Sequence, residues 1–247
     1  MSLYVKSSPG EFLKFRVESC AEQELLHNPI FRETRLGHLT ESHLGFYHFN
    51  LKYIMAKTPG HLKLAAQMAA QLGELDCAES FQKRIPEEMG HDLWAAQDLA
   101  SLNLNPAVKA RLHVLPAIKK LNEFILTAIK ADPLNYAVYA LWAEYFTVLV
   151  VPPFVADLEK YCGISPQVMT VLTRHAEIDK DHVADDVAII NQLLSKRLNY
   201  NLNSFFKIVD WATEHYRNFA EQILEAHNEI PLFRNSADQV PAPAPLG

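Results

Sequence analysis

Five prolines lie at positions where helices are expected to begin. They occur in the pairs Thr58-Pro59, Ile85-Pro86, Asn105-Pro106, Asp132-Pro133 and Ser165-Pro166. Proline fits the first turn of a helix because the N–H that it lacks has no helical partner there, and Thr, Asn, Asp or Ser before it can cap the helix. Between these points apolar residues recur with a period near 3.6 rather than 2. The pattern predicts an all-α fold.

Glycine is scarce, and the chain is mildly acidic. Only 8 of the 247 residues are glycine, where average usage would give roughly 17. Because tight β-turns and phosphate-binding loops need glycine, a β-rich or nucleotide-binding fold is disfavoured. The net charge is −6, and lysines and arginines are scattered along the chain. Nucleic acid is therefore not expected as a partner.

The helical segments predict a single domain. We expect one domain over residues 1–234, built as a bundle of seven or eight helices, because no internal repeat or linker is visible. Residues 235–247 contain three prolines and almost no large apolar side chains, which predicts a disordered tail. The helices are expected near 10–27, 40–57, 59–80, 86–102, 106–130 (bent at Pro116), 133–160 (kinked at Pro152), 166–197 and 201–228.

The cysteines and one long apolar stretch bear on the compartment. Three cysteines without C-x-x-C spacing favour a reducing cytoplasm over disulfides or structural zinc. Residues 1–10 lack the apolar run of a signal peptide. Residues 137–156 have the length of a membrane span, but they contain Glu144 and the pair Pro152-Pro153. We expect a buried core helix of a cytoplasmic protein that does not span a membrane.

The expected helix at 166–197 carries ionisable groups in the middle of its apolar face. Solvated charges lie opposite such a face, and buried carboxylates and imidazoles need partners. A cation bound by these groups would supply the partners, and we favour it over a buried network of ion pairs. Asp186 is expected to orient an imidazole. Steps of four and three residues along the face give Val168, Leu172, His175, Asp179, His182, Asp186, Ile189 and Leu193.

Two other segments offer ligands of the same kind. Glu88 and His91 have the spacing Glu-x-x-His, which on one helix places both side chains side by side, as in di-iron carboxylate proteins. Glu87 is kept as a substitute ligand, although an exposed acid in a first helical turn also explains it. Glu144 is the one charged residue within 137–156. Its carboxylate would add a third helix to the same centre.

The histidine spacing favours two metal ions over one. His175 and His182 are seven residues apart, about 10.5 Å of helical rise, whereas two nitrogens on one ion lie within about 4.2 Å. Two ions about 3.5–4 Å apart, with Asp179 between them, fit this span. Donors without thiolates suit iron or manganese, with zinc as an alternative. Reducible iron with open coordination positions would activate O2.

In order along the chain, Glu-x-x-His, a lone Glu in an apolar helix and His-x-x-x-Asp-x-x-His resemble the haem-oxygenase-like di-iron oxidases over roughly residues 20–195. That family includes an undecene-forming fatty-acid decarboxylase and the chlamydial death-domain-associating protein that makes p-aminobenzoate, within the broader TenA/PqqC-like superfamily. The resemblance implies a haem-oxygenase-like helical topology. It also implies one iron on Glu88, His91 and His175 and another on Asp179 and His182, with Glu144 shared or bridging.

The chain departs from that family in two places. Several members carry a further carboxylate on the second helix or one turn before the Glu of Glu-x-x-His. This chain reads Tyr-His-Phe-Asn at 47–50 and Phe-Gln-Lys-Arg at 81–84, so the second iron is expected to be labile. The p-aminobenzoate-forming member consumes a tyrosine just beyond its first-helix histidine, and residues 27–31 contain none. Chemistry of that kind is not expected here.

The sequence thus predicts a non-haem di-iron oxidase or oxygenase. Its expected partners are O2 and a small organic substrate held in an apolar pocket, and a homodimer is left open. One alternative is a non-catalytic binding or interaction protein on the same scaffold. Others are a haem-binding member with His27 as axial ligand and a pyrimidine-related member of thiaminase type, for which Cys162 is a poor candidate nucleophile.

Overall fold

The computed structural model describes residues 8–197 and 199–229, and all regular secondary structure in these ranges is helical. The predicted all-α fold is confirmed, while the predicted disordered tail at 235–247 lies outside the described residues. The helices are α1 (Pro9–His27), α2 (Pro29–Arg35), α3 (Glu41–Met55), α4 (Thr58–Gln71), α5 (Leu75–Glu88), α6 (His91–Ser101), α7 (Pro106–Lys109), α8 (Pro116–Ala131), α9 (Pro133–Cys162), the 3-10 helix η1 (Pro166–Val168), α10 (Thr170–Ser195) and α11 (Leu202–Asn228).

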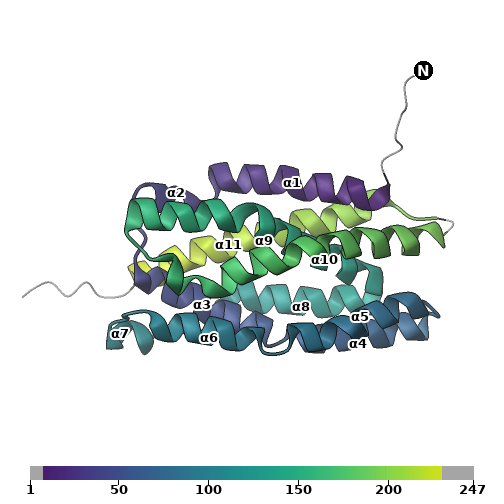
Figure 1. Ribbon diagram of the computed structural model, residues 1–247, viewed down its shortest axis with the longest axis horizontal. Coiled ribbons are helices and arrows are strands. Elements are labelled where there is room, and N and C mark those ends of the chain that lie inside the picture. Colours follow the sequence, from purple (N-terminus) through teal and green to yellow (C-terminus); the bar gives the residue numbers. More distant parts are fainter. Residues whose placement is uncertain (1–7, 198, 230–247) are drawn as a thin grey trace, which may run out of the picture.

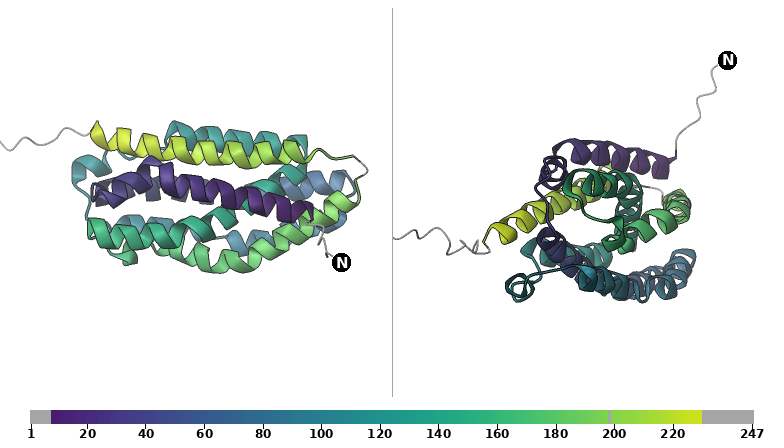
Figure 2. Two further views of the ribbon diagram at one scale, coloured as in Figure 1. Left: turned by 90° about the horizontal axis from the view of Figure 1, so that it is seen from above. Right: turned by 60° about the vertical axis from the view of Figure 1, so that its left-hand side comes forward.

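The long helices run along the long axis of the bundle. Figure 1 shows α1 and α2 along one edge and α4 to α7 along the opposite edge, with α9, α10 and α11 between them. Seen from above, α1 lies between α11 and α10 (Figure 2), and it contacts α9, α10 and α11. The buried apolar side chains form one continuous core. The site described below lies inside this bundle, where α5 and α6 meet α9 and α10.

Several predicted helix boundaries differ from the structure. The predicted helix 59–80 is divided into α4 and α5, with Gly73 between them at a positive φ of 76°. The predicted helix 106–130 is divided into α7 and α8, so Pro116 begins a helix rather than bending one. The 3-10 helix η1 precedes α10, and α2 was not predicted as a separate helix. These breaks shorten the helices without changing the fold class.

The prediction that a helix begins at Pro86 is wrong. Pro86 lies in the last turn of α5, where its missing N–H costs one hydrogen bond and the helix ends two residues later. The break falls instead at Gly90, whose φ of 91° lies in the left-handed region that glycine adopts without steric cost. This break separates Glu88 from His91, which has consequences for the site.

The long apolar helix takes the position predicted for it. Within the described residues, α9 is the one helix whose length and composition would suffice for a membrane span. It packs against α1, α2, α8, α10 and α11, and Val138, Leu141 and Leu158 on it are almost completely buried. This is the environment of a core helix, and it places Glu144 in the interior of the bundle.

Candidate metal centre

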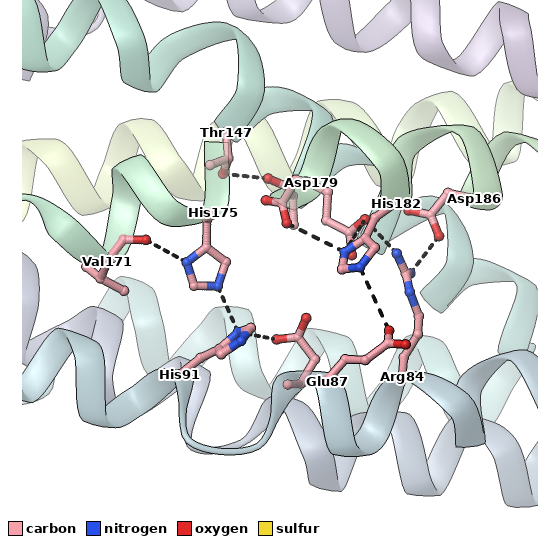
Figure 3. A network of polar contacts seen from close by, with 12 residues as sticks. Arg84, Glu87, His91, Thr147, Val171, His175, Asp179, His182 and Asp186 are labelled. Carbon is pink, nitrogen blue, oxygen red and sulfur yellow. Dashed lines mark hydrogen bonds and ion pairs between the residues drawn. The ribbon is translucent and has the colours of Figure 1, made fainter. Parts of the chain in front are cut away.

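The predicted ligands come from four helices and converge on the break between α5 and α6. Figure 3 shows His175 and His182 projecting from α10 toward His91, Glu87 and Arg84 on α6 and α5. Glu88 is the last residue of α5 and His91 the first of α6. The expectation that Glu-x-x-His lies on one helix is therefore wrong. The turn nevertheless brings the two side chains together, with His91 Nδ1 3.1 Å from Glu88 Oε2.

One set of three donors lies at this turn. In what we call the first donor group, Glu88, His91 and His175 each offer one ligand atom, all within 4.8 Å of one another. His175 Nε2 lies 3.0 Å from His91 Nδ1. His175 Nδ1 lies 2.7 Å from the carbonyl oxygen of Val171 and donates to it. This bond leaves the lone pair on Nε2, facing the other donors, as a metal ligand requires.

A second set lies further along α10. In what we call the second donor group, Glu88, Glu144 and His182 offer ligand atoms within 4.8 Å of one another. His182 Nδ1 is 3.9 Å from Glu144 Oε2 and 3.7 Å from Asp179 Oδ1. These separations are too long for hydrogen bonds, and His182 Nδ1 is buried without a hydrogen-bond partner. They match donors on either side of one ion, since metal–ligand distances are about 2.0–2.2 Å.

The arrangement differs in detail from the predicted ligand sets. His175 and His182 fall in different groups, as their spacing along the helix requires. Glu88 belongs to both groups, whereas the sequence analysis gave the shared position to Glu144. Asp179 is buried next to His182 but is not a member of either group. The residues present therefore fit one ion at the first donor group and an adjacent ion at the second.

An unpredicted arginine contacts the second donor group. Arg84, one turn before Glu88 on α5, donates from Nη1 to Asp186 Oδ1 and from Nη2 to Glu144 Oε2, both at 2.7 Å. Asp186 thus has a guanidinium partner where the sequence analysis expected an imidazole. The other oxygen of Asp186, Oδ2, is buried without a partner. Arg84 therefore neutralises only part of the buried negative charge.

Burial sets the electrostatics of the carboxylates. Burial and the neighbouring Asp186 carboxylate raise the pKa of Glu144 well above its usual value. Burial likewise raises the pKa of Asp179 and Asp186. Burial opposes the ionisation of Glu88 too, but the hydrogen bond from His91 and the neighbouring His175 and Arg84 together outweigh it, and the pKa of Glu88 is lowered. Ionising all four carboxylates would need positive charge beyond Arg84, which a divalent cation would provide.

The remaining candidates lie outside the two donor groups. The Glu87 side chain is 40% exposed, and its Oε2 is 3.8 Å from His182 Nε2. His27 is exposed at the end of α1 and does not line the cavity described below, which removes the basis for a haem ligand there. Cys162 ends α9, and its Sγ donates to the carbonyl of Thr34. Burial raises the pKa of the Cys162 thiol, so nothing activates it as a nucleophile.

A cavity of about 210 Å³ adjoins the donor groups. Glu88, Glu144, His175 and Asp179 form one part of its wall. Most of the rest is aliphatic or aromatic, and no lysine or arginine of the described residues lines it. Its apolar side includes Leu51, Ile54, Ile118, Leu121, Val150, Val151 and Leu172. An organic molecule in this cavity would lie against these donor atoms.

Asp98 of α6 fixes the start of α10 and so the position of His175. The residue before α10, Met169, provides no side-chain cap. Asp98, which is 1% exposed, supplies one from another helix. It accepts hydrogen bonds from Val171 N at 2.8 Å and Thr170 Oγ1 at 2.5 Å. Because the Val171 carbonyl holds the His175 ring, this contact links α6 to the geometry of the first donor group.

Replacing Asp98 by alanine is expected to destabilise the protein by about 2 kcal/mol, because two buried donors at the start of α10 lose a charged acceptor. Thermal unfolding should show a Tm lowered by roughly 4–8 °C. Asp181→Ala is the matched control, since Asp181 is exposed on α10, the helix that Asp98 caps. Equal Tm values for the two variants would contradict the role of Asp98 as a cap.

Comparison with known proteins identifies the fold but no closer relative. No protein-family model matches the chain, and no curated protein matches it. A domain of unknown function with a haem-oxygenase-like fold from Shewanella denitrificans OS217 superposes with a TM-score of 0.75 at 17% identity, covering 88% of this chain and 93% of that one. The predicted haem-oxygenase-like topology is therefore confirmed.

Two further solved structures share the fold. A TenA homologue from Pseudomonas syringae pv. tomato DC3000 gives a TM-score of 0.67 at 12% identity over 87% of this chain and 92% of that one. A CADD-like protein of unknown function from Nostoc punctiforme PCC 73102 gives 0.59 at 14% identity over 89% and 99%. At these identities the likeness concerns the fold alone, and function has to be argued from the site.

Proposed function

We propose that this protein is an O2-dependent oxidoreductase with a non-haem iron centre, which oxidises a small organic substrate in the apolar cavity. The observation that supports it best is the pair of donor groups that share Glu88 on the wall of that cavity. Neutral imidazoles and carboxylates without thiolates suit iron, with manganese as the alternative metal. Bound ferrous iron would supply electrons to O2 and so generate the oxidant.

The chain's own residues would hold and orient the metal. Glu88, His91 and His175 would hold the first ion, with the Val171 carbonyl fixing the His175 ring. Glu88, Glu144 and His182 would hold the second ion, with Asp179 beside His182 as a further acceptor. The four helices around the site would exclude water and prevent side reactions.

The cavity wall would select the substrate. Its aliphatic side would bind an apolar body by contact, while the metal-bearing wall would face the bond to be oxidised. Since no lysine or arginine of the described residues lines the cavity, an anionic substrate group would have no cationic side chain to bind. The expected substrate is therefore predominantly apolar, and any polar group on it would be directed toward the metal.

Anaerobic loading with Fe(II) followed by a pulse of O2 tests the proposal. We expect tight iron uptake and O2 consumption with a transient visible absorbance. His182→Ala should abolish that absorbance, because it removes the one imidazole of the second donor group. Circular dichroism should show that the variant keeps its helices. Failure of the wild-type protein to take up iron at near-stoichiometric concentration would refute the proposal.

A second candidate function is a non-catalytic binding protein on the same scaffold. The observation that favours it is Arg84, whose guanidinium pairs with two of the buried carboxylates. In that case the cavity would bind an apolar ligand, and the polar groups would hold α5, α9 and α10 together. Site variants would then lower Tm, and the wild-type protein would show neither iron uptake nor O2 consumption.

A further inference from the structure

Arg84 contacts the same carboxylate oxygen that faces the second donor group. Its Nη2 lies 2.7 Å from Glu144 Oε2, the atom that is 3.9 Å from His182 Nδ1. The Arg84 side chain is 10% exposed, so water screens its charge poorly. A divalent ion bound to Glu144 Oε2 at about 2.1 Å would lie very close to the guanidinium. The two cations would repel each other and would compete for one oxygen.

The first donor group is free of this competition. The hydrogen bonds and ion pairs of Arg84 go to Glu144 and Asp186, and neither residue is a member of that group. His91 instead contacts both His175 and Glu88. An ion there would meet three donors whose partners are one another. The two donor groups thus differ in one respect. The Arg84 guanidinium must move before a metal ion can bind at the second group, whereas no such movement is needed at the first.

Arg84 does not complete the second half of the site. With the guanidinium in place, His182 Nδ1 and Asp186 Oδ2 remain buried without hydrogen-bond partners. Buried polar atoms of this kind are costly to leave unpaired. The surroundings of the second donor group therefore resemble a cation site in which Arg84 neutralises part of the carboxylate charge. Other polar atoms there are left without a partner.

We propose that Arg84 is a built-in competitor for the second metal ion, so that the protein binds one divalent ion tightly at the first donor group and a second one far more weakly. This inference rests on the proposed metal-dependent function. It adds that one residue sets the metal stoichiometry. A residue that merely positioned Glu144 for the metal would have the opposite effect on the second ion when removed.

Anaerobic titration calorimetry with Mn2+ tests the inference without any redox reaction. For the wild-type protein we expect one tight ion and a second bound at least a hundredfold more weakly. In Arg84→Gln the second ion should bind at least tenfold more tightly, while affinity for the first changes less than threefold. Arg84→Lys, which keeps the charge, should resemble the wild type. Arg174→Gln is the control, because Arg174 lies over the Trp94 ring and contacts neither Glu144 nor Asp186.

A stability measurement covers the case in which Arg84→Gln folds poorly. Without Arg84, Glu144 and Asp186 lose their partner, so the metal-free variant should have a lower Tm than the wild type. Saturating Mn2+ should then raise its Tm by more than that of the wild type, and Arg84→Gln/Glu144→Gln should lose the extra increase. Unchanged or weaker binding of the second ion in Arg84→Gln would overturn the inference, as would the absence of Mn2+ binding in every variant. Normal Mn2+ binding without O2 consumption by the iron-loaded protein would instead refute only the oxidase.

Discussion

Replacing Glu88 by glutamine should remove both metal ions at once. Glu88 is the one residue common to the two donor groups, and a neutral amide oxygen is a much poorer ligand for a divalent ion than a carboxylate. Since even the loss of an outer partner of a ligand costs about 10–100-fold in metal affinity, affinity should fall by more than about a hundredfold. Mn2+ titration would measure the change for both ions, and metal analysis after gel filtration would measure it for the tightly bound one.

Glu87→Gln is the matched control for this experiment. It makes the same chemical change one residue earlier, on a side chain that is 40% exposed and belongs to neither donor group. The Glu87→Gln variant should still bind both ions. Its affinity for each should lie within about threefold of the wild-type value, an effect typical of a weak, partly screened charge. If Glu88→Gln retained the wild-type stoichiometry, Glu88 could not be the shared ligand.

Replacing His175 by alanine should eliminate O2 consumption by the iron-loaded protein while leaving the fold intact. His175 supplies one of the two imidazoles of the first donor group, held in place by the Val171 carbonyl. The expected loss of metal affinity exceeds about a hundredfold, by the same reasoning as for Glu88. The loss of two hydrogen bonds, to the Val171 carbonyl and to His91, should cost only about 2 kcal/mol of stability. Oxygen consumption, metal content and Tm separate these effects.

His215→Ala is the control for the metal measurements. His215 also lines the cavity and also contacts the carbonyl four residues earlier on its own helix, Trp211, with Nδ1 at 3.0 Å. It is not a member of either donor group, so its replacement should leave the metal stoichiometry unchanged. A His175→Ala variant that kept its metal but lost Tm strongly would support the structural network instead.

The polar face of α10 shows how far the sequence alone could lead. His175, Asp179, His182 and Asp186 interrupt an apolar face at helical spacing, so their placement in the interior follows from periodicity. Asp179 and Asp186 are indeed 3% exposed. The seven-residue separation of the histidines likewise places them in different donor groups. A straight helix carries its geometry in its spacing, which is why periodicity alone could place this face in the interior.

The turn between α5 and α6 shows where such reasoning stops. The motif Glu-x-x-His reads the same in the sequence whether it lies on one helix or spans a break between two. Pro86 suggested that a helix begins there, whereas α5 continues through it. The signal that could have located the break was Gly90, since glycine is common where a helix ends in a left-handed conformation. The two side chains meet because the turn folds back and because α10 packs against both α5 and α6.

Of the site residues, Arg84 is the one that sequence reasoning had least cause to select. It lies among polar neighbours on an amphipathic helix, where an arginine usually remains solvated. Its spacing of one turn from Glu88 was visible, but its partners are 60 and 102 residues away along the chain. Only the packing of α5 against α9 and α10 reveals that its charge is buried between two carboxylates.

The sequence alone determined the helix content, the interior position of the α10 face and the choice of candidate ligand residues, because each depends on residues within a few turns of one another. Tertiary structure decided which carboxylate is shared, which oxygen Arg84 contacts, how Asp98 caps a different helix and that a cavity lies beside the donors. These features depend on distances between helices that are distant along the chain. Such distances are set by how the whole core packs, and they cannot be predicted from a local sequence pattern.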